Sequence, residues 1–261
     1  MQDSLSFFRI TYFDEVSSTN DLIKQSIDKG APEGEVVCAR VQAAGYGRQG
    51  RVWKSPEGGL YMSVLLRPAV EPAQLPTLSL VVGIAVRRAI AGLAELSSAN
   101  NVLVKWPNDI VLCMSADKNS GAFQKLCGIS NEQHSGAICI GIGVNVQKPH
   151  SSNDVGGKNV AAYVSDIVRS NAPSIDLVCR TILQNFLNCY TEWIQTGFAT
   201  FLEEYNANSA LTGREVRVQR ADGSLIAEGI VCGIDSTGAL VVRDAEGAKR
   251  KVLSGEAHIA L

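Results

Sequence analysis

Short runs of apolar residues separated by polar or glycine-containing turns recur along the first 146 residues, and each run has the length of a strand. The runs lie at residues 7–13, 36–41, 60–66, 102–104, 110–113, 125–129 and 137–146. Turn-forming residues bound several of them, as Pro68 does after the third run, which is typical of strand ends. We therefore predict that a sheet forms the centre of this part of the chain.

Longer segments with helical character lie between and after these strands. Ser18 and Asp21 have the spacing of a capping box, and Gly30 is a suitable stop for the helix that begins there. Residues 75–96 are the most apolar segment, but two adjacent arginines interrupt it. Its uncharged part is shorter than the roughly 20 residues that a membrane span needs, so we expect a buried core helix and no membrane partner. Further helical patterns occupy residues 160–168 and 174–206.

The pattern changes near Leu211, after which short apolar runs alternate with turn signals. The turn signals are Asp222-Gly223, Ser236-Thr237-Gly238 and Glu246-Gly247. About fifty residues of this kind predict a small β-barrel. We therefore expect an α+β protein with two domains, residues 1–208 with a central mixed or antiparallel sheet and helices, and residues 209–261 as the barrel.

Composition narrows the class of protein without naming a function. Of the 261 residues, 46% are hydrophobic and 19% are charged, which supports a sizeable core and excludes a disordered chain. The net charge of −2 gives no indication of nucleic acid or an anionic membrane as a partner. The seven cysteines include no C-x-x-C pair, so a reducing, cytoplasmic location is expected. The N-terminus also lacks the basic and apolar segments of a signal peptide.

One glycine-rich loop attracts attention because Gly45-Tyr46-Gly47-Arg48-Gln49-Gly50 matches the dinucleotide motif G-x-G-x-x-G and follows a predicted strand. That motif also requires a helix to begin at its last glycine. Here Pro56, Gly58 and Gly59 follow, and they forbid a regular helix. The phosphate-binding motif G-x-x-x-x-G-K-[ST] is absent from the chain as well. A dinucleotide fold is therefore excluded, and any use of ATP is not of the P-loop kind.

The same loop has residues suited to an anion. Glycine lets the backbone approach a ligand closely, and Arg48 and Arg51 present planar guanidinium groups that match phosphate or carboxylate. Composition alone leaves a solvated surface loop equally open. A second segment, Lys105-Trp106-Pro107-Asn108-Asp109, adds a cation, an aromatic wall and oxygens of the kind that Mg²⁺ prefers, although Pro-Asn-Asp is also a common turn. The case for a binding site rests on the two segments together.

Taken together, these segments resemble the biotin–protein ligase family. The family pattern contains, in order, Ser-Thr-Asn, Gln-x-x-Gly-Arg-Gly-Arg-x-Gly-Arg-x-Trp, Gly-Leu-Tyr-x-Ser, Lys-Trp-Pro-Asn-Asp, Lys-Leu-x-Gly-Ile and Gly-x-Gly-x-Asn. The chain has matching segments in the same order at residues 18–20, 42–53, 59–63, 105–109, 125–129 and 141–145. The resemblance covers nearly the whole chain. It implies the biotin/lipoate ligase fold, which is similar to class II synthetases, and an SH3-like form for the C-terminal barrel.

The resemblance implies an ATP-dependent, AMP-forming ligase. Biotin would be activated by ATP to biotinyl-5′-AMP and then transferred to a lysine of a biotin carboxyl carrier protein domain of a biotin-dependent carboxylase. The expected ligands are thus biotin as substrate, ATP and Mg²⁺. The resemblance is also compatible with a homodimer through sheet edges, although the sequence itself does not give the oligomeric state.

The matching positions imply a role for each candidate residue. Arg48 and Lys125 are the expected catalytic cations that face the phosphate. The residues expected to bind biotin are Ser18, Thr19, Asn20, Gln42, Tyr46, Gly47, Arg48 and Lys125. The residues expected to bind ATP or the adenylate are Arg51, Trp53, Lys105, Asn108, Asp109 and Asn145, with Asp109 also as a Mg²⁺ ligand. Since water destroys an acyl adenylate, we expect residues 42–53 to be poorly ordered alone and to close over the ligand.

The chain departs from the family pattern at two places. Tyr46 stands where arginine is usual, which removes one charge from the loop, and the stretch 113–124 is longer and more polar than usual. Family members sometimes carry an N-terminal DNA-binding domain. The sixteen residues before Ser17 are too few for one, so no DNA partner is expected.

Other functions stay open at this point. Lipoate or octanoate protein ligases and transferases share the fold and use a different acid, whereas a non-catalytic sensor of biotin or its adenylate would retain the pocket. The segments 42–53 and 105–109 favour biotin, and the presence of Arg48 and Lys125 disfavours a sensor. A plain nucleotide-binding module would leave the C-terminal barrel unexplained.

Overall fold

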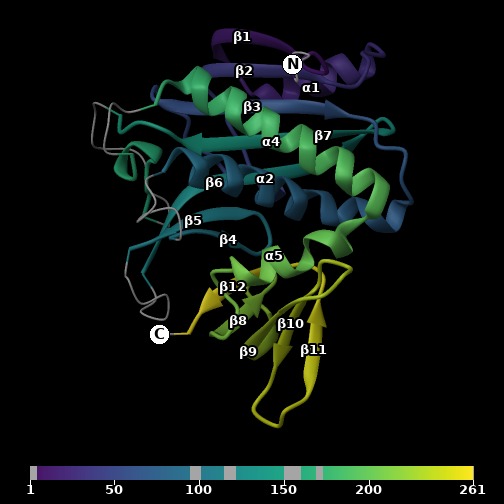
Figure 1. Cartoon of the computed structure of the whole chain (residues 1–261), viewed down its shortest axis with the longest axis vertical. Helices are drawn as coiled ribbons and strands as arrows, with labels where there is room; N and C mark the ends of the chain where they lie inside the picture. Colours follow the sequence, from purple (N-terminus) through teal and green to yellow (C-terminus); the bar gives the residue numbers. More distant parts are fainter. Residues whose placement is uncertain (1–4, 95–100, 115–121, 150–159, 169–172, 261) are drawn as a thin grey trace.

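The computed structural model describes residues 5–94, 101–114, 122–149, 160–168 and 173–260. Its larger part is built on a seven-stranded sheet with the strand order β1-β2-β3-β7-β6-β5-β4 (Figure 1). The strands are β1 (Arg9–Val16), β2 (Glu35–Gln42), β3 (Gly59–Leu66), β4 (Val102–Lys105), β5 (Asp109–Cys113), β6 (Phe123–His134) and β7 (Ala137–Asn145). β1 and β2 are parallel, and the other neighbouring pairs are antiparallel. The predicted mixed sheet is confirmed.

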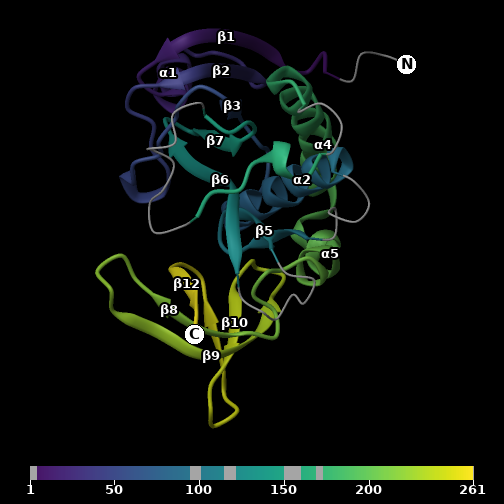
Figure 2. The same cartoon turned by 90° about the vertical axis from the view of Figure 1, so that its left-hand side faces the viewer.

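Helices cover both faces of this sheet. α1 (Thr19–Asp28) packs on one face, where Ile23 is buried in one cluster with Val37 of β2. α2 (Leu78–Leu93) and α4 (Ile175–Thr196) lie on the other face, and Figure 2 shows them across the sheet from α1. Because alternate strand residues point to opposite faces, the central strands β3 and β7, which are buried along nearly all of their length, supply residues to both of these cores.

The long C-terminal helical pattern forms two helices instead of one. α4 begins after Ser174, whose hydroxyl accepts a hydrogen bond from the Leu177 amide at 3.1 Å. It ends at Gly197, which adopts a φ of 72°, a conformation that glycine favours. A single 3-10 turn then leads into α5 (Leu202–Ala207). The helical pattern predicted for residues 174–206 is thus present, with an interruption at this glycine.

Residues 160–168 also differ from the prediction of a helix. The backbone at Val160 and Ala162 pairs with Lys125 of β6, with N···O distances of 2.8 and 3.0 Å. Only Val164–Asp166 forms a turn of 3-10 helix. Tertiary pairing with a strand therefore overrides the local helical pattern in this segment. Most of the longer 113–124 stretch, residues 115–121, lies outside the described residues.

The apolar segment before β4 forms a core helix. Pro72–Leu93 is long and apolar enough to cross a membrane by composition, but 61% of its most apolar window is buried inside the protein. It packs chiefly against α4 and the strands β4 and β6. The predicted buried helix is thus present, and its apolar surface faces protein.

The C-terminal part is a five-stranded antiparallel sheet with the order β11-β10-β9-β8-β12. Its strands are β8 (Glu215–Gln219), β9 (Leu225–Ile234), β10 (Leu240–Arg243), β11 (Lys249–Val252) and β12 (Glu256–Ile259). The three turn signals read from the sequence separate β8 from β9, β9 from β10 and β10 from β11. This arrangement agrees with the small SH3-like domain that was expected.

The C-terminal sheet docks beside α5 and the β4–β5 end of the larger sheet (Figure 1). The Trp106 indole Nε1 donates a hydrogen bond to the Gly238 carbonyl at 3.1 Å. Asn206 of α5 pairs through its side-chain amide with the Ile234 backbone, at 3.2 and 2.8 Å. Gly238 has a φ of 81°, and a Cβ on it would lie 2.8 Å from the Leu80 Cδ1 atom. The β9–β10 turn therefore fixes the C-terminal sheet to the larger domain.

Asp235 organises this docking turn. Its Oδ1 atom accepts hydrogen bonds from the Thr237 amide at 2.9 Å and the Ala239 amide at 3.1 Å, while Oδ2 lies 2.8 Å from Lys251 Nζ. Burial disfavours the charged carboxylate, but the contacts with Lys251, Thr237 and Ala239 outweigh it and lower the pKa of Asp235 from 3.8 to about 2. The ionised form is thus favoured by folding.

Asp235→Asn is expected to lower the free energy of unfolding by about 2 kcal/mol at neutral pH. Because the folded-state pKa is depressed, this contribution is present above pH 3.8 and is lost as the pH falls towards about 2. Urea unfolding of both proteins at pH 7, 5, 4 and 3 measures the difference, which should shrink only at the lowest values. Asp222→Asn, in the exposed β8–β9 turn, is the control and should change much less. A difference independent of pH would contradict the ionic explanation.

Candidate active site

A cavity of about 720 Å³ lies between the glycine-rich loop, the β6–β7 surface and the start of β12. Most of the sequence-predicted site residues line it, namely Thr19, Asn20, Gln42, Tyr46, Gly47, Arg48, Arg51, Trp53, Lys105, Asn108, Asp109, Lys125 and Asn145. Ser18 is not among the lining residues. It is buried at the N-cap of α1, and its side chain makes no capping hydrogen bond, so the predicted capping box is absent. Asp21, the expected partner in that box, binds Tyr46 instead.

The glycine-rich loop folds back on itself as a short, irregular hairpin. Its two arms are joined by hydrogen bonds from the Gly47 amide to the Arg51 carbonyl and from the Trp53 amide to the Gly45 carbonyl, both at 2.8 Å. At its tip Gln49 adopts a φ of 58°, in the left-handed region. The hairpin directs Tyr46, Arg48 and Trp53 towards one cavity. Its ordering on ligand binding stays a prediction.

One end of the cavity is polar and uncharged. The Gln42 Oε1 atom accepts hydrogen bonds from the Thr19 amide at 2.9 Å and the Thr19 hydroxyl at 3.0 Å. The Asn20 Oδ1 atom accepts from the Ser63 hydroxyl at 2.6 Å, and its Nδ2 donates to Ser130 Oγ at 3.2 Å. These amides and hydroxyls hold one another in place. They suit a neutral ligand group that both donates and accepts hydrogen bonds.

Glycines form the floor on which Asn20 and Trp53 lie. A Cβ on Gly141 would be 2.4 Å from Asn20 Oδ1, and one on Gly143 would be 2.6 Å from Trp53 Nε1. A Cβ on Gly128 of β6 would be 2.9 Å from the Trp53 Cζ3 atom. Gly141 and Gly143 are two residues apart on β7, so they face the same side of the sheet. The Gly-x-Gly pattern is therefore explained by close approach of side chains to the strand.

The other end of the cavity is cationic. Lys125 Nζ lies 2.8 Å from Asp109 Oδ1 and 5.1 Å from the centroid of the Trp53 ring. Arg48 Nη1 donates a hydrogen bond to Asn108 Oδ1 at 3.3 Å. The loop and the Lys-Trp-Pro-Asn-Asp segment, far apart in sequence, thus meet around Lys125 and Arg48.

The cavity carries an excess of positive charge. Its lining includes the cations Arg48, Arg51, Lys54, Lys105 and Lys125, against the carboxylates Asp109 and Glu256. Burial lowers the pKa of Lys105, although the nearby Asp109 acts in the opposite direction. Burial likewise lowers the pKa of Arg48. Partly buried cations with depressed pKa values are stabilised by an incoming anion, so this end is suited to a polyphosphate or carboxylate.

Sequence reasoning missed two contributions to the site. Glu256 on β12 forms an ion pair with Arg51, so the C-terminal sheet helps to close the cavity, and no local motif marks that residue. Lys24 and Glu132 lie behind the polar end and contact Asn20 or Tyr46. The helical spacing places Lys24 near Asn20, but nothing in the sequence points to Glu132 on β6 as their partner.

Comparisons with known proteins agree with this geometry. Residues 12–146 match the model of the biotin/lipoate A/B protein ligase family, and residues 211–258 match the biotin protein ligase C terminal domain. The bifunctional ligase/repressor BirA of Bacillus spizizenii is 30% identical over 244 residues, which cover 92% of this chain and 71% of that protein. The biotin–[acetyl-CoA-carboxylase] ligase of Paracoccus denitrificans is 30% identical over 219 residues, covering 81% and 85%.

A solved structure is similar over almost the full length of both chains. The biotin protein ligase from Aquifex aeolicus in complex with biotin and ATP has a TM-score of 0.79 and 26% sequence identity. The similarity covers 97% of this chain and 98% of that one, so it includes the C-terminal sheet as well as the larger domain.

Proposed function

Because the chain belongs to the biotin/lipoate A/B protein ligase family, we propose that it activates biotin with ATP and transfers the biotin to a lysine of a carrier protein. The observation that carries this proposal is one continuous cavity with a neutral, hydrogen-bonding end at Asn20 and Gln42 and a cationic end at Arg48 and Lys125. Relatives named as biotin ligases, and a similar structure that holds biotin and ATP, support it.

In the first step a carboxylate oxygen of biotin attacks the α-phosphorus of ATP. The bond from that phosphorus to the bridging oxygen of pyrophosphate breaks, and biotinyl-5′-AMP forms. Two anions must approach each other, and negative charge develops on the phosphorus oxygens. Arg48 and Lys125 supply fixed positive charge at the cationic end of the cavity, which stabilises the negative charge that develops in this step. Trp53 provides an aromatic face beside Lys125 for the nucleotide side.

In the second step the neutral amine of a carrier lysine attacks the acyl carbon of the adenylate. A C–N bond forms, the bond to the phosphate oxygen breaks, and AMP leaves with the electron pair while the amine loses a proton to solvent. The mixed anhydride reacts with water too, so the loop must shield it until the carrier arrives. A biotin carboxyl carrier protein domain is the partner, in line with the relatives named as acetyl-CoA-carboxylase ligases.

Mg²⁺ is part of the proposal as a companion of ATP. Asp109 and Asn108 offer the oxygen ligands that Mg²⁺ prefers, and they lie at the cationic end of the cavity. The described residues contain no cluster of three acidic, histidine or cysteine side chains. These residues therefore fit an ion that the phosphates of ATP would hold for the most part, with Asp109 as its ligand from the protein. When bound there, Mg²⁺ would neutralise phosphate charge.

The neutral end of the cavity favours biotin over lipoate or octanoate. A ureido ring both donates and accepts hydrogen bonds and can pair with Asn20, Thr19 and Gln42. An alkyl chain or dithiolane ring cannot, so binding it there would desolvate amide and hydroxyl groups without compensation.

The decisive experiment measures pyrophosphate release from ATP and Mg²⁺ by the purified protein with biotin, lipoate or octanoate added separately. We expect stimulation by biotin alone. Stimulation by lipoate or octanoate instead would place the enzyme among the lipoate or octanoate protein ligases. No stimulation by any acid, with biotin still binding, would support the sensor function.

The loop at residues 42–53 is expected to be protected by ligands. Trypsin cleaves after Arg48 and Arg51, and both sites lie near the exposed tip of the hairpin. Biotin with ATP should slow cleavage at these two positions several-fold, because the loop then closes over the adenylate. Cleavage after the exposed Arg220, in the C-terminal sheet, is the internal control. Equal rates with and without ligands would contradict closure.

Two further parts of the proposal concern the cellular compartment and the oligomeric state of the enzyme. All seven cysteines are free, and six of them are buried, which fits a reducing compartment such as the cytoplasm. A homodimer through an edge of the seven-stranded sheet would use β1, because the backbone of residues 208–210 pairs with Val104 at the β4 edge. Sedimentation at increasing protein concentration measures that association.

A further inference from the structure

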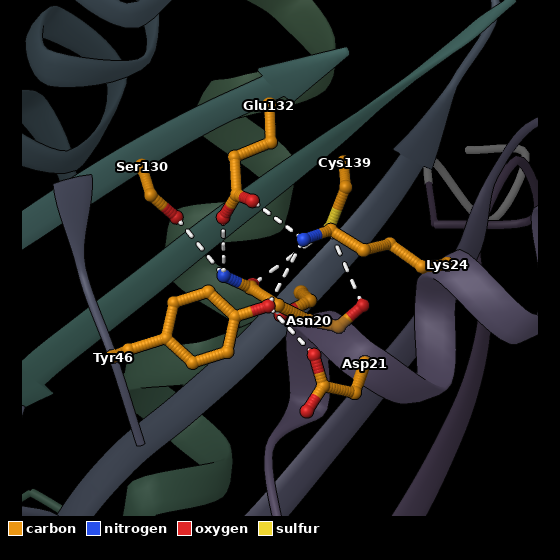
Figure 3. A network of polar contacts seen from close by, with 8 residues as sticks. Asn20, Asp21, Lys24, Tyr46, Ser130, Glu132 and Cys139 are labelled. Atoms are coloured by element: carbon orange, nitrogen blue, oxygen red, sulfur yellow. Dashed lines mark hydrogen bonds and ion pairs between the residues drawn. The ribbon is translucent and has the colours of Figure 1, made fainter. Parts of the chain in front are cut away.

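A charged cluster of Lys24, Glu132 and Asp21 contacts Asn20 and Tyr46, as Figure 3 shows. Asn20 and Tyr46 line the cavity, whereas the three charged residues do not. Lys24 of α1 places its Nζ atom 2.5 Å from Glu132 Oε2 and 3.0 Å from the Tyr46 hydroxyl oxygen. The same ammonium lies 5.3 Å from the centroid of the Tyr46 ring. The side chains of Lys24 and Glu132 are 24% and 28% exposed, so water screens the pair only in part. None of these contacts is used by the chemistry described above.

The cluster connects to Asn20 on one side. Glu132 accepts a hydrogen bond from Asn20 Nδ2 at 3.0 Å through its Oε1 atom, while its Oε2 atom accepts from Lys24. Asn20 Nδ2 also donates to Ser130, and Asn20 Oδ1 accepts from Ser63. Glu132 and Ser130 are two residues apart on β6 and share a face, whereas Asn20 and Lys24 are one helical turn apart on α1. The carboxylate thus decides which way the Asn20 amide points.

The cluster connects to the loop on the other side. The Tyr46 hydroxyl donates a hydrogen bond to Asp21 Oδ1 at 2.6 Å and accepts one from Lys24. Figure 3 shows the phenol between Asp21 and Lys24, at the surface of α1. The phenol thus donates one hydrogen bond and accepts another, and both of its partners are charged residues of α1. These two bonds attach the first arm of the glycine-rich loop to the helix.

We propose that the Lys24–Glu132 pair is a positioning device for the biotin end of the site, matched to tyrosine at position 46. It fixes the Asn20 amide and the Tyr46 ring together, so that the wall formed by these two residues is in place before biotin arrives. This inference rests on the proposed function. Preorganisation of this kind improves affinity because less freedom is lost on binding.

Charge explains why Tyr46 and Lys24 form a matched pair. An arginine at position 46, the residue usual in the family pattern, would bring a guanidinium next to the Lys24 ammonium. Two cations would then compete for Asp21 and Glu132, and like charges at this distance repel. Tyrosine instead accepts a hydrogen bond from the ammonium. The loss of one charge in the loop is thus coupled to the presence of a lysine on α1.

The test measures the dissociation constant for biotin by calorimetry without ATP, on the full chain. Tyr46→Phe and Lys24→Met should each weaken binding about tenfold, since each removes a charge-assisted hydrogen bond. The double variant should be little weaker than either single variant, because both changes disconnect the same device. Lys29→Met, at the exposed end of α1, is the matched control and should bind biotin like the original chain.

A second set of variants keeps the proposal testable if one of the single variants folds poorly. Tyr46→Arg should weaken binding, and adding Lys24→Met should recover most of the loss, because the new guanidinium can then pair with Asp21 and Glu132 in place of the ammonium. In steady-state pyrophosphate assays the KM for biotin should change while the KM for ATP stays close to its original value. A general structural defect would alter both.

Additive effects of the two single changes, or no rescue of Tyr46→Arg by Lys24→Met, would overturn the proposal. So would unchanged biotin affinity in both single variants, provided that the original chain binds biotin. Failure of the original chain to bind biotin would overturn the proposed function itself and the inference with it, so the two failures are distinguishable.

Discussion

Lys125→Met is expected to reduce biotin-dependent pyrophosphate release by about 10²–10³-fold. The Lys125 ammonium lies 2.8 Å from Asp109 and beside Trp53, at the cationic end of the cavity. An ammonium there opposes the charge that develops as the carboxylate approaches the α-phosphate. Because this interaction strengthens in the transition state, the loss should appear mainly in kcat and less in the KM for biotin.

The change also leaves Asp109 without its cation, so folding must be checked alongside activity. The Asp109 side chain is only 17% exposed, and a buried charge without a partner costs stability. Lys125→Met/Asp109→Asn removes both charges and should regain the melting temperature but not the activity. Lys249→Met, on the exposed face of β11, is a control for the loss of one lysine. If the activity of Lys125→Met stayed within about threefold of that of the original chain, a catalytic role for Lys125 would be excluded.

The elements and motifs that the sequence could predict are those whose evidence is local. Apolar runs with turn residues at their ends predicted the seven strands of the large sheet, and three turn signals predicted the breaks between β8, β9, β10 and β11, because turn chemistry acts over a few residues. No turn signal predicted the break between β11 and β12. The Gly-x-Gly segment could be placed on a strand, but its reason could not be seen. Only the structure shows that Gly141 accommodates Asn20, which comes from a distant helix.

The parts that could not be predicted depend on contacts between distant segments. Ser18 and Asp21 have the pattern of a helix cap, yet Tyr46 from the loop takes the Asp21 carboxylate. Lys24 and Glu132 are 108 residues apart in sequence, and neither belongs to a motif. In each case a tertiary hydrogen bond or ion pair decides the role of a residue whose neighbours in sequence carry no sign of it.

Gly143→Ala is expected to reduce biotin-dependent adenylation about 10- to 100-fold, since it displaces the Trp53 indole from the surface of β7. A Cβ at this position would lie 2.6 Å from Nε1 and 2.7 Å from Cε2 of that ring. The strand cannot move away, because β7 is paired on both sides, with Tyr61 and Gly128 opposite Gly143. The rigid ring must shift instead, and it carries the aromatic face beside Lys125 with it.

A double-mutant cycle separates this steric effect from a general weakening of β7. Gly143→Ala should lower the free energy of unfolding by about 1–3 kcal/mol in the original chain, as overpacking does. In the Trp53→Ala background the same change should cost almost nothing, since the clashing ring is gone. Gly92→Ala is the control, because a Cβ there meets no atom within 4 Å. Equal costs of Gly143→Ala in both backgrounds would show that the strand, and not the indole, requires glycine at this position.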